Sequence, residues 1–106
     1  MMELYRRPEH AETRWASFEN PTAGRGVAAH ANHGAKGHAF EGIEPGATKV
    51  LFHVEGCGTI RRMWLTVSDR SPVGLRGLRL DIYWDGANRP AASVPLGDFF
   101  GLAHGR

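Results

Sequence analysis

Three histidines lie within nine residues of one another in the first half of the chain, at His30, His33 and His38. Imidazoles on a flexible loop can bind zinc or copper when the backbone brings them to one point. Their spacing matches no established metal motif, and structural zinc prefers thiolates, of which the chain has only Cys57. We therefore expect exposed loop histidines and an exposed turn cysteine, with no bound metal and no cofactor.

Carboxylates are the next candidates for acid–base or nucleophilic chemistry. Eight carboxylates are candidates: Glu19, Glu41, Glu44, Glu55, Asp69, Asp81, Asp85 and Asp98. Hydrolysis of a glycosidic bond with retention needs one protonated and one ionised carboxyl group about 5 Å apart. Asp85 precedes Gly86, where a turn alone explains it, and Asp98 precedes two phenylalanines, where it could lie beside an aromatic surface or cap a loop. No pair is identified by its spacing.

The tryptophans offer a surface on which a sugar ring could stack. Trp84 shares the face of an alternating segment with Leu80 and Ile82, which predicts a position in the core. Trp64 alternates with Met63 and Leu65 and lies on the polar side of its segment. Trp64 is therefore the better candidate for a ligand or subunit surface.

The charge pattern bears on possible partners. The chain has 13 basic and 11 acidic residues, and its only adjacent basic pairs are Arg6-Arg7 and Arg61-Arg62. Nucleic-acid binding requires a denser cluster of positive charge, so we expect no nucleic acid as partner. No apolar stretch is long enough to span a bilayer, and no membrane partner is expected. The charged beginning favours the cytoplasm, or secretion if a signal lies outside this sequence.

The elements that must position these residues divide the chain into three parts. Residues 1–19 are expected to form an N-terminal arm or short helix, since Pro8 interrupts any longer one. Residues 20–49 are rich in glycine and predict a long loop, which is a common place for a site. Residues 50–106 contain alternating segments separated by glycine and proline turns, which predicts antiparallel strands.

These strands predict the fold class. The alternating segments lie at 48–55, 59–68, 78–85 and 92–96, and the sequence shows no helical periodicity of any length. The expectation is an all-β protein, an antiparallel jelly-roll or β-sandwich. Leu, Ile, Val and Phe make up only about a fifth of the chain, which is little for a closed core. We therefore expect an incomplete first roll.

Several segments resemble a known family, and they are SFENPT at 17–22, GTIRRMWLT at 58–66, LDIYWDG at 80–86 and VPLGDFFG at 94–101. Over residues 13–105 the chain is similar to the N-terminal part of glycoside hydrolase family 172. The resemblance implies two jelly-rolls in tandem, assembled as homotrimers or multiples of them. It also implies a retaining hydrolase or transglycosidase that acts on furanosides of the fructofuranoside or arabinofuranoside type.

The family's catalytic glutamate pair lies beyond the matched region and has no counterpart in this chain. We therefore expect an N-terminal fragment that is inactive alone. Candidate substrate-binding residues are Trp64 as a sugar platform and Asp85 and Asp98 as acceptors of hydrogen bonds from hydroxyl groups. Glu19 and Arg61 are secondary candidates for substrate binding. Turn and packing roles explain the two aspartates equally well. The alternative function is a non-catalytic carbohydrate-binding or assembly β-sandwich module.

Overall fold

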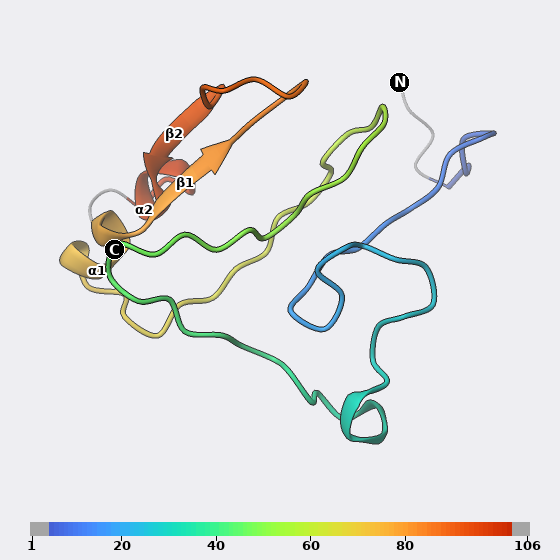
Figure 1. The fold of residues 1–106 in the computed structure, drawn as a ribbon, viewed down its shortest axis with the longest axis horizontal. Coiled ribbons are helices and arrows are strands. Elements are labelled where there is room, and N and C mark those ends of the chain that lie inside the picture. Colours follow the sequence, from blue (N-terminus) through green and yellow to red (C-terminus); the bar gives the residue numbers. More distant parts are fainter. Residues whose placement is uncertain (1–4, 103–106) are drawn as a thin grey trace. The chain divides into compact units, whose positions relative to one another are not determined.

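The computed structural model describes residues 5–102 and divides the chain into two compact units that meet between Thr59 and Ile60. Within the described residues, the regular structure of the first unit is the 3-10 helix η1 (Ala31–Gly34). The second unit contains α1 (Pro72–Gly77), β1 (Arg79–Ile82), β2 (Ala92–Pro95) and α2 (Leu96–Phe99) (Figure 1). None of the helices within residues 5–102 has the length and apolar character needed to cross a membrane.

A single asparagine organises the start of the first unit. The side chain of Asn20 donates to the carbonyl oxygens of Trp15 and Gly24 at 3.2 and 2.9 Å and accepts from the Gly24 amide at 2.9 Å. Its backbone exchanges two hydrogen bonds with Ser17. Asn20 is only 5% exposed, so these bonds replace the water that its amide has lost. They close residues 15–24 into a tight local turn.

The hairpin of β1 and β2 forms where the sequence alternates most regularly. The two strands are antiparallel, and Asp81 lies opposite Ser93 in the register. Asp85 and Gly86 both have positive φ angles, of 54° and 67°, and the Ala87 amide bonds the Trp84 carbonyl oxygen at 3.1 Å. This is the geometry of a turn with two left-handed central residues, for which an Asp-Gly pair is well suited.

Two short helices flank the hairpin. Ser71 caps α1 by accepting a hydrogen bond from the Gly74 amide at 3.1 Å, and Pro72 occupies the first turn, where its missing N–H costs nothing. Helix α2 follows β2 directly and approaches α1 closely. A Cβ atom at Gly97 would lie 2.9 Å from the Leu75 Cβ, so this contact requires glycine. Leu75, which is 7% exposed, is the buried residue of α1.

The prediction of an all-β jelly-roll or β-sandwich is wrong. The described residues form one two-stranded sheet and two short α-helices. The segments 48–55 and 59–68 alternate in sequence, yet no backbone hydrogen bond between described residues involves 50–54 or 62–68. Alternation of polar and apolar residues shows that the two faces of a segment differ in polarity. A β-strand also needs a neighbouring strand to which its backbone can form hydrogen bonds. The helices were missed because four or six residues are too few to display a helical period.

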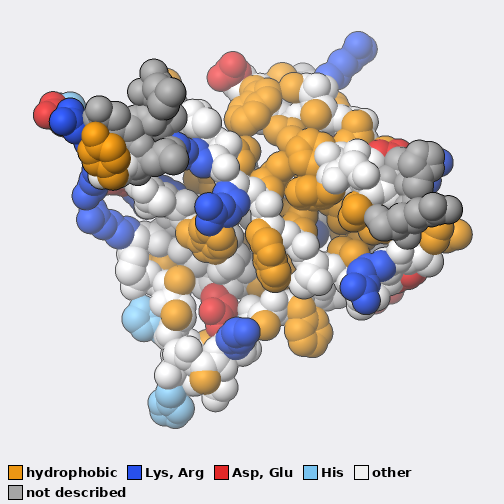
Figure 2. Space-filling view, turned by 180° about the vertical axis from the view of Figure 1, so that it is seen from behind, with side chains coloured by type: hydrophobic (Ala, Val, Ile, Leu, Met, Phe, Trp, Pro, Cys, Tyr) orange, Lys and Arg blue, Asp and Glu red, His pale blue; other side chains and the backbone are white. Residues whose placement is uncertain are grey.

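The core is smaller than the sequence pattern suggested. Among the described hydrophobic residues only Ala23 and Leu75 are buried. Trp84, expected in the core, is 50% exposed because it lies past the end of β1, where the turn begins. Trp64 is exposed as expected. Hydrophobic side chains accordingly occupy much of the visible surface in Figure 2.

Candidate functional site

The expected sugar platform lies on the second unit. Trp64 is 74% exposed on the extended segment 60–67. Its neighbour Leu65 and the next residue of the same face, Val67, instead line an apolar groove. Because successive side chains of an extended segment point to opposite sides, Trp64 is presented away from this groove. An exposed indole of this kind is free to stack on an apolar ring face.

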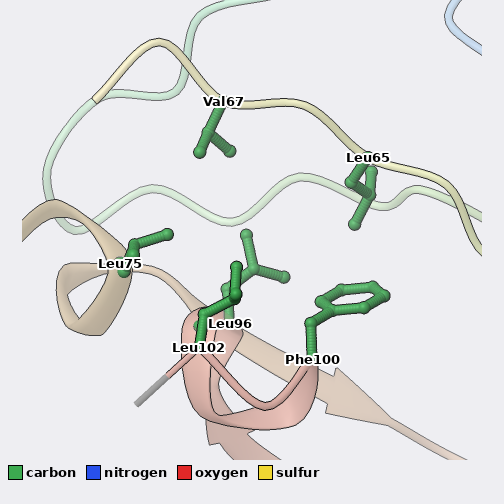
Figure 3. Close-up of a pocket in the computed structure, with 7 residues that line it drawn as sticks. Leu65, Val67, Leu75, Leu96, Phe100 and Leu102 are labelled. Atoms are coloured by element: carbon green, nitrogen blue, oxygen red, sulfur yellow. The ribbon is translucent and has the colours of Figure 1, made fainter. Parts of the chain in front are cut away.

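The apolar groove lies between this segment and the two helices (Figure 3). It has a volume of about 190 Å³. Its lining consists of apolar side chains and one glycine from the segment, from α1 and from the α2 region: Leu65, Val67, Leu75, Leu96, Gly97, Phe100 and Leu102. In Figure 3 the side chains of Leu65 and Val67 point toward those of Leu75, Leu96 and Phe100. Such a lining can hold an apolar group but offers no acid, base or nucleophile.

Asp98 lies beside this groove in the first turn of α2. Its Oδ1 is 3.5 Å from the Nε of Arg76 at the end of α1. The same oxygen is buried and has no hydrogen-bond partner within the described part of the chain. The carboxylate therefore links the two helices through charge and keeps an acceptor that no described donor uses.

Asp85 and Arg61 have different surroundings. Asp85 is exposed at the tip of the turn that follows β1, in a left-handed conformation. Arg61 is exposed at the beginning of the second unit. None of Trp64, Asp85 and Asp98 contacts another of the three in the described structure through a hydrogen bond, ion pair or ring contact. The structure therefore places these candidates on one unit without assembling them into a pocket.

The best-defined charged cluster of this unit was not among the candidates. Asp81 accepts from the Ser93 hydroxyl across the sheet at 2.6 Å and from Nε and Nη2 of Arg79 at 3.2 and 2.8 Å. The Ser93 bond first, and then Arg79, lower the pKa of Asp81, and the Asp81 carboxylate raises the pKa of Arg79. The alternation of polar residues in 79–81 and 93 could have revealed this polar face, but only the register pairs Asp81 with Ser93.

Glu19 belongs to a cluster in the first unit that closes the base of the glycine-rich loop. Its Oε1 accepts from the His38 backbone amide at 3.1 Å. The His38 ring stacks near Phe18, with ring centroids 6.0 Å apart, and its Nε2 lies 3.0 Å from Glu41. Glu41 also pairs with Lys49. These contacts connect both ends of the loop with its middle. Glu19 therefore helps to hold the loop in its conformation.

The histidines of this loop do not converge. His30 bonds the carbonyl oxygen of Gly26 at 2.9 Å, and His38 faces Glu41. Across residues 5–102 no three His, Cys, Asp or Glu side chains are grouped so that they could share a metal ion. Cys57 is exposed, as expected.

The comparison with known proteins concerns mainly the second unit. A family model described as GH172 domain-like matches residues 36–106, about two thirds of the chain. The match includes the hairpin, both α-helices, Trp64, Asp85 and Asp98. Separate comparisons find no match among curated proteins and none among solved structures. The chain therefore belongs to the GH172 domain-like family of glycoside hydrolases.

Proposed function

We propose that this chain is the N-terminal part of a retaining glycoside hydrolase or transglycosidase that acts on furanosides, of the fructofuranoside or arabinofuranoside type. The observation that carries the proposal is the family match over residues 36–106, which contains the YWDG segment at 83–86 and the GDFF segment at 97–100. In this proposal the chain supplies scaffold and substrate contacts for the hydrolase.

The substrate contacts are assigned mainly to side chains of the second unit. Trp64 provides a flat apolar face for the sugar ring, which its high exposure supports. Asp85, which is exposed, and Asp98, which is half-buried, accept hydrogen bonds from sugar hydroxyls in this proposal. Arg61, on the second unit, and Glu19, on the first, are secondary candidates for substrate contact.

The acid and the nucleophile of the reaction are assigned to residues outside this chain. A general acid at neutral pH needs a carboxyl group whose pKa is raised. The carboxyl pKa shifts in the described structure go the other way: hydrogen bonds from Ser71 lower that of Asp69, and Ser93 and Arg79 lower that of Asp81. Such carboxylates stay ionised and can accept hydrogen bonds, but they cannot donate a proton to a leaving group.

The test measures binding and turnover separately. We expect the 106-residue chain to bind a fructofuranosyl or arabinofuranosyl oligosaccharide, as followed by titration calorimetry, and to release no sugar from it. Trp64→Ala should weaken binding about tenfold, or about 1.4 kcal/mol, because the stacking face is lost. Trp15→Ala removes an exposed indole from the other unit and should leave the affinity unchanged.

Two results would overturn this assignment. Sugar release by the isolated chain at an enzymatic rate would show that catalytic carboxylates are present within it. Equal affinities of the wild-type chain and the Trp64→Ala variant would remove Trp64 from the substrate contacts.

Assembly into a homotrimer or a multiple of it is part of the proposal. Large apolar side chains such as Phe40, Phe52 and Phe100 are more than a third exposed, which supports a subunit interface.

A further inference from the structure

The first unit contains a pocket that neither the family match nor the proposed function uses. It has a volume of about 290 Å³ and is lined by Arg7, Glu12, Thr13 and Arg25. We propose that this pocket binds the phosphate group of a small phosphomonoester, such as a sugar phosphate, through Arg7, Thr13 and Arg25. The four residues lie outside the matched range 36–106, so the proposal stands independently of the glycosidase assignment.

The fold brings together arginines that are far apart in the sequence. Arg7 and Arg25 are separated by a turn, which Asn20 holds closed, and both line the same pocket. Arg14 supports this arrangement, since its Nη1 donates to the Ala23 carbonyl oxygen at 3.2 Å. The sequence shows only one adjacent basic pair in this region, so the basic pocket depends on the folded turn.

The charges leave the pocket positive. Arg14 uses its Nε and Nη2 to hold Oε2 of Glu12 at 3.1 and 2.8 Å, so this pair balances itself. Arg25 is farther away, with its Nη1 3.8 Å from the other Glu12 oxygen, and its side chain is 79% exposed. Arg7 donates one hydrogen bond, from Nη2 to the Ala11 carbonyl oxygen at 3.2 Å. The pocket lining thus carries two guanidinium groups, of Arg7 and Arg25, and one carboxylate, of Glu12, which pairs with both Arg14 and Arg25.

The donors suit a phosphate better than an uncharged sugar. A guanidinium has five N–H donors in a planar fork that matches two oxygens of a phosphate, and the Thr13 hydroxyl adds one more donor. The pocket volume of about 290 Å³ is just below the range of about 300–1,000 Å³ that is typical of small-molecule sites. This size suits a monosaccharide phosphate. An uncharged sugar would bring no negative charge to Arg7 and Arg25.

The experiment uses the full chain and titration calorimetry with three probes: inorganic phosphate, fructose 6-phosphate and fructose. We expect saturable millimolar binding of fructose 6-phosphate, no binding of fructose, and an affinity that falls as sodium chloride is added. Tighter binding of fructose 6-phosphate than of inorganic phosphate identifies a sugar phosphate as ligand. Equal binding of both identifies the phosphate group alone as the ligand.

Variants locate the site. Arg25→Ala should weaken fructose 6-phosphate binding at least tenfold, whereas Arg89→Ala, at an exposed arginine of the second unit, should not. Glu12→Gln should increase the affinity severalfold, because it removes the negative charge from the pocket. Absence of phosphate binding, or equal losses from Arg25→Ala and Arg89→Ala, would overturn the proposal. The circular dichroism spectrum of Arg25→Ala should match that of the wild-type chain, since Arg25 is largely exposed.

Discussion

Asp81 illustrates how single side chains carry the polar organisation of the second unit. Its two carboxylate oxygens are used by different partners, Oδ1 by Ser93 and Oδ2 by Arg79. Hydrogen bonds to the ionised form favour that form and lower the pKa. A group of this type contributes stability above its unfolded-state pKa, and the contribution disappears as the pH falls through the folded-state pKa.

This reasoning predicts the effect of removing the first partner. Ser93→Ala should raise the pKa of Asp81 toward its usual value, because the hydroxyl makes the largest contribution to the shift. The stability that the carboxylate confers should then be lost at a higher pH than in the wild-type chain. A carbon-detected NMR titration of the Asp81 carboxyl group measures the change. Asp69, which is held by Ser71, is the internal control, and an unchanged Asp81 pKa would contradict the prediction.

The close approach of α1 and α2 is the feature that determines how the elements of the second unit pack. Gly97 lies against Leu75, and the Leu96 amide bonds the Leu78 carbonyl oxygen at 2.8 Å. Arg76 and Asp98 add a charged contact between the same helices. The apolar groove depends on this packing, since Leu75, Leu96 and Gly97 all line it.

Gly97→Ala should therefore destabilise the second unit. The added methyl group would lie 2.9 Å from the Leu75 Cβ, and forcing apart such a contact costs about 1–3 kcal/mol. Gly77→Ala is the matched control, because a Cβ atom there meets nothing within 4 Å. Thermal or urea unfolding of the two variants measures the difference. Equal stabilities would show that the helices can separate without cost.

At the scale of the whole molecule, the chain buries few of its apolar groups. Ala23 and Leu75 are the buried hydrophobic residues of the described chain, and large side chains such as Trp64, Trp84 and Phe52 are exposed. Burial of apolar surface is the main favourable contribution to folding and to stable association. Association with a partner can therefore bury more of the apolar surface of this chain than its own core does.

We expect the protein to associate with copies of itself for this reason. Size-exclusion chromatography with light scattering at micromolar concentration should give a mass of a trimer or a multiple of it. Phe100→Glu, which places a charge in the lining of the apolar groove, should shift the mass toward the monomer. Val73→Glu, at an exposed helix position away from that groove, should not. A monomeric wild-type chain at all concentrations would contradict the expectation.

The sequence determined the features that depend on neighbouring residues. The alternation in 78–85 and 92–96 predicted strands where β1 and β2 form, and Asp85-Gly86 predicted the turn. Four motifs predicted the family to which the chain belongs: those in 58–66, 80–86 and 94–101 lie inside the matched range, and that in 17–22 lies outside it. The Ser71-Pro72 pair is typical of a helix start, but the helix that begins there is too short to show a helical period in the sequence.

The tertiary structure determined which segments form backbone hydrogen bonds with a neighbouring strand. Segments 48–55 and 59–68 have the composition of strands, but a ladder requires a second backbone at hydrogen-bonding distance, and none is recorded for residues 50–54 or 62–68 within the described chain. The pairing of Asp81 with Ser93, and the meeting of Arg7 and Arg25 at one pocket, likewise follow from register and from a closed turn. Local sequence sets backbone preference and polarity, whereas contacts between distant residues exist only once the chain has folded.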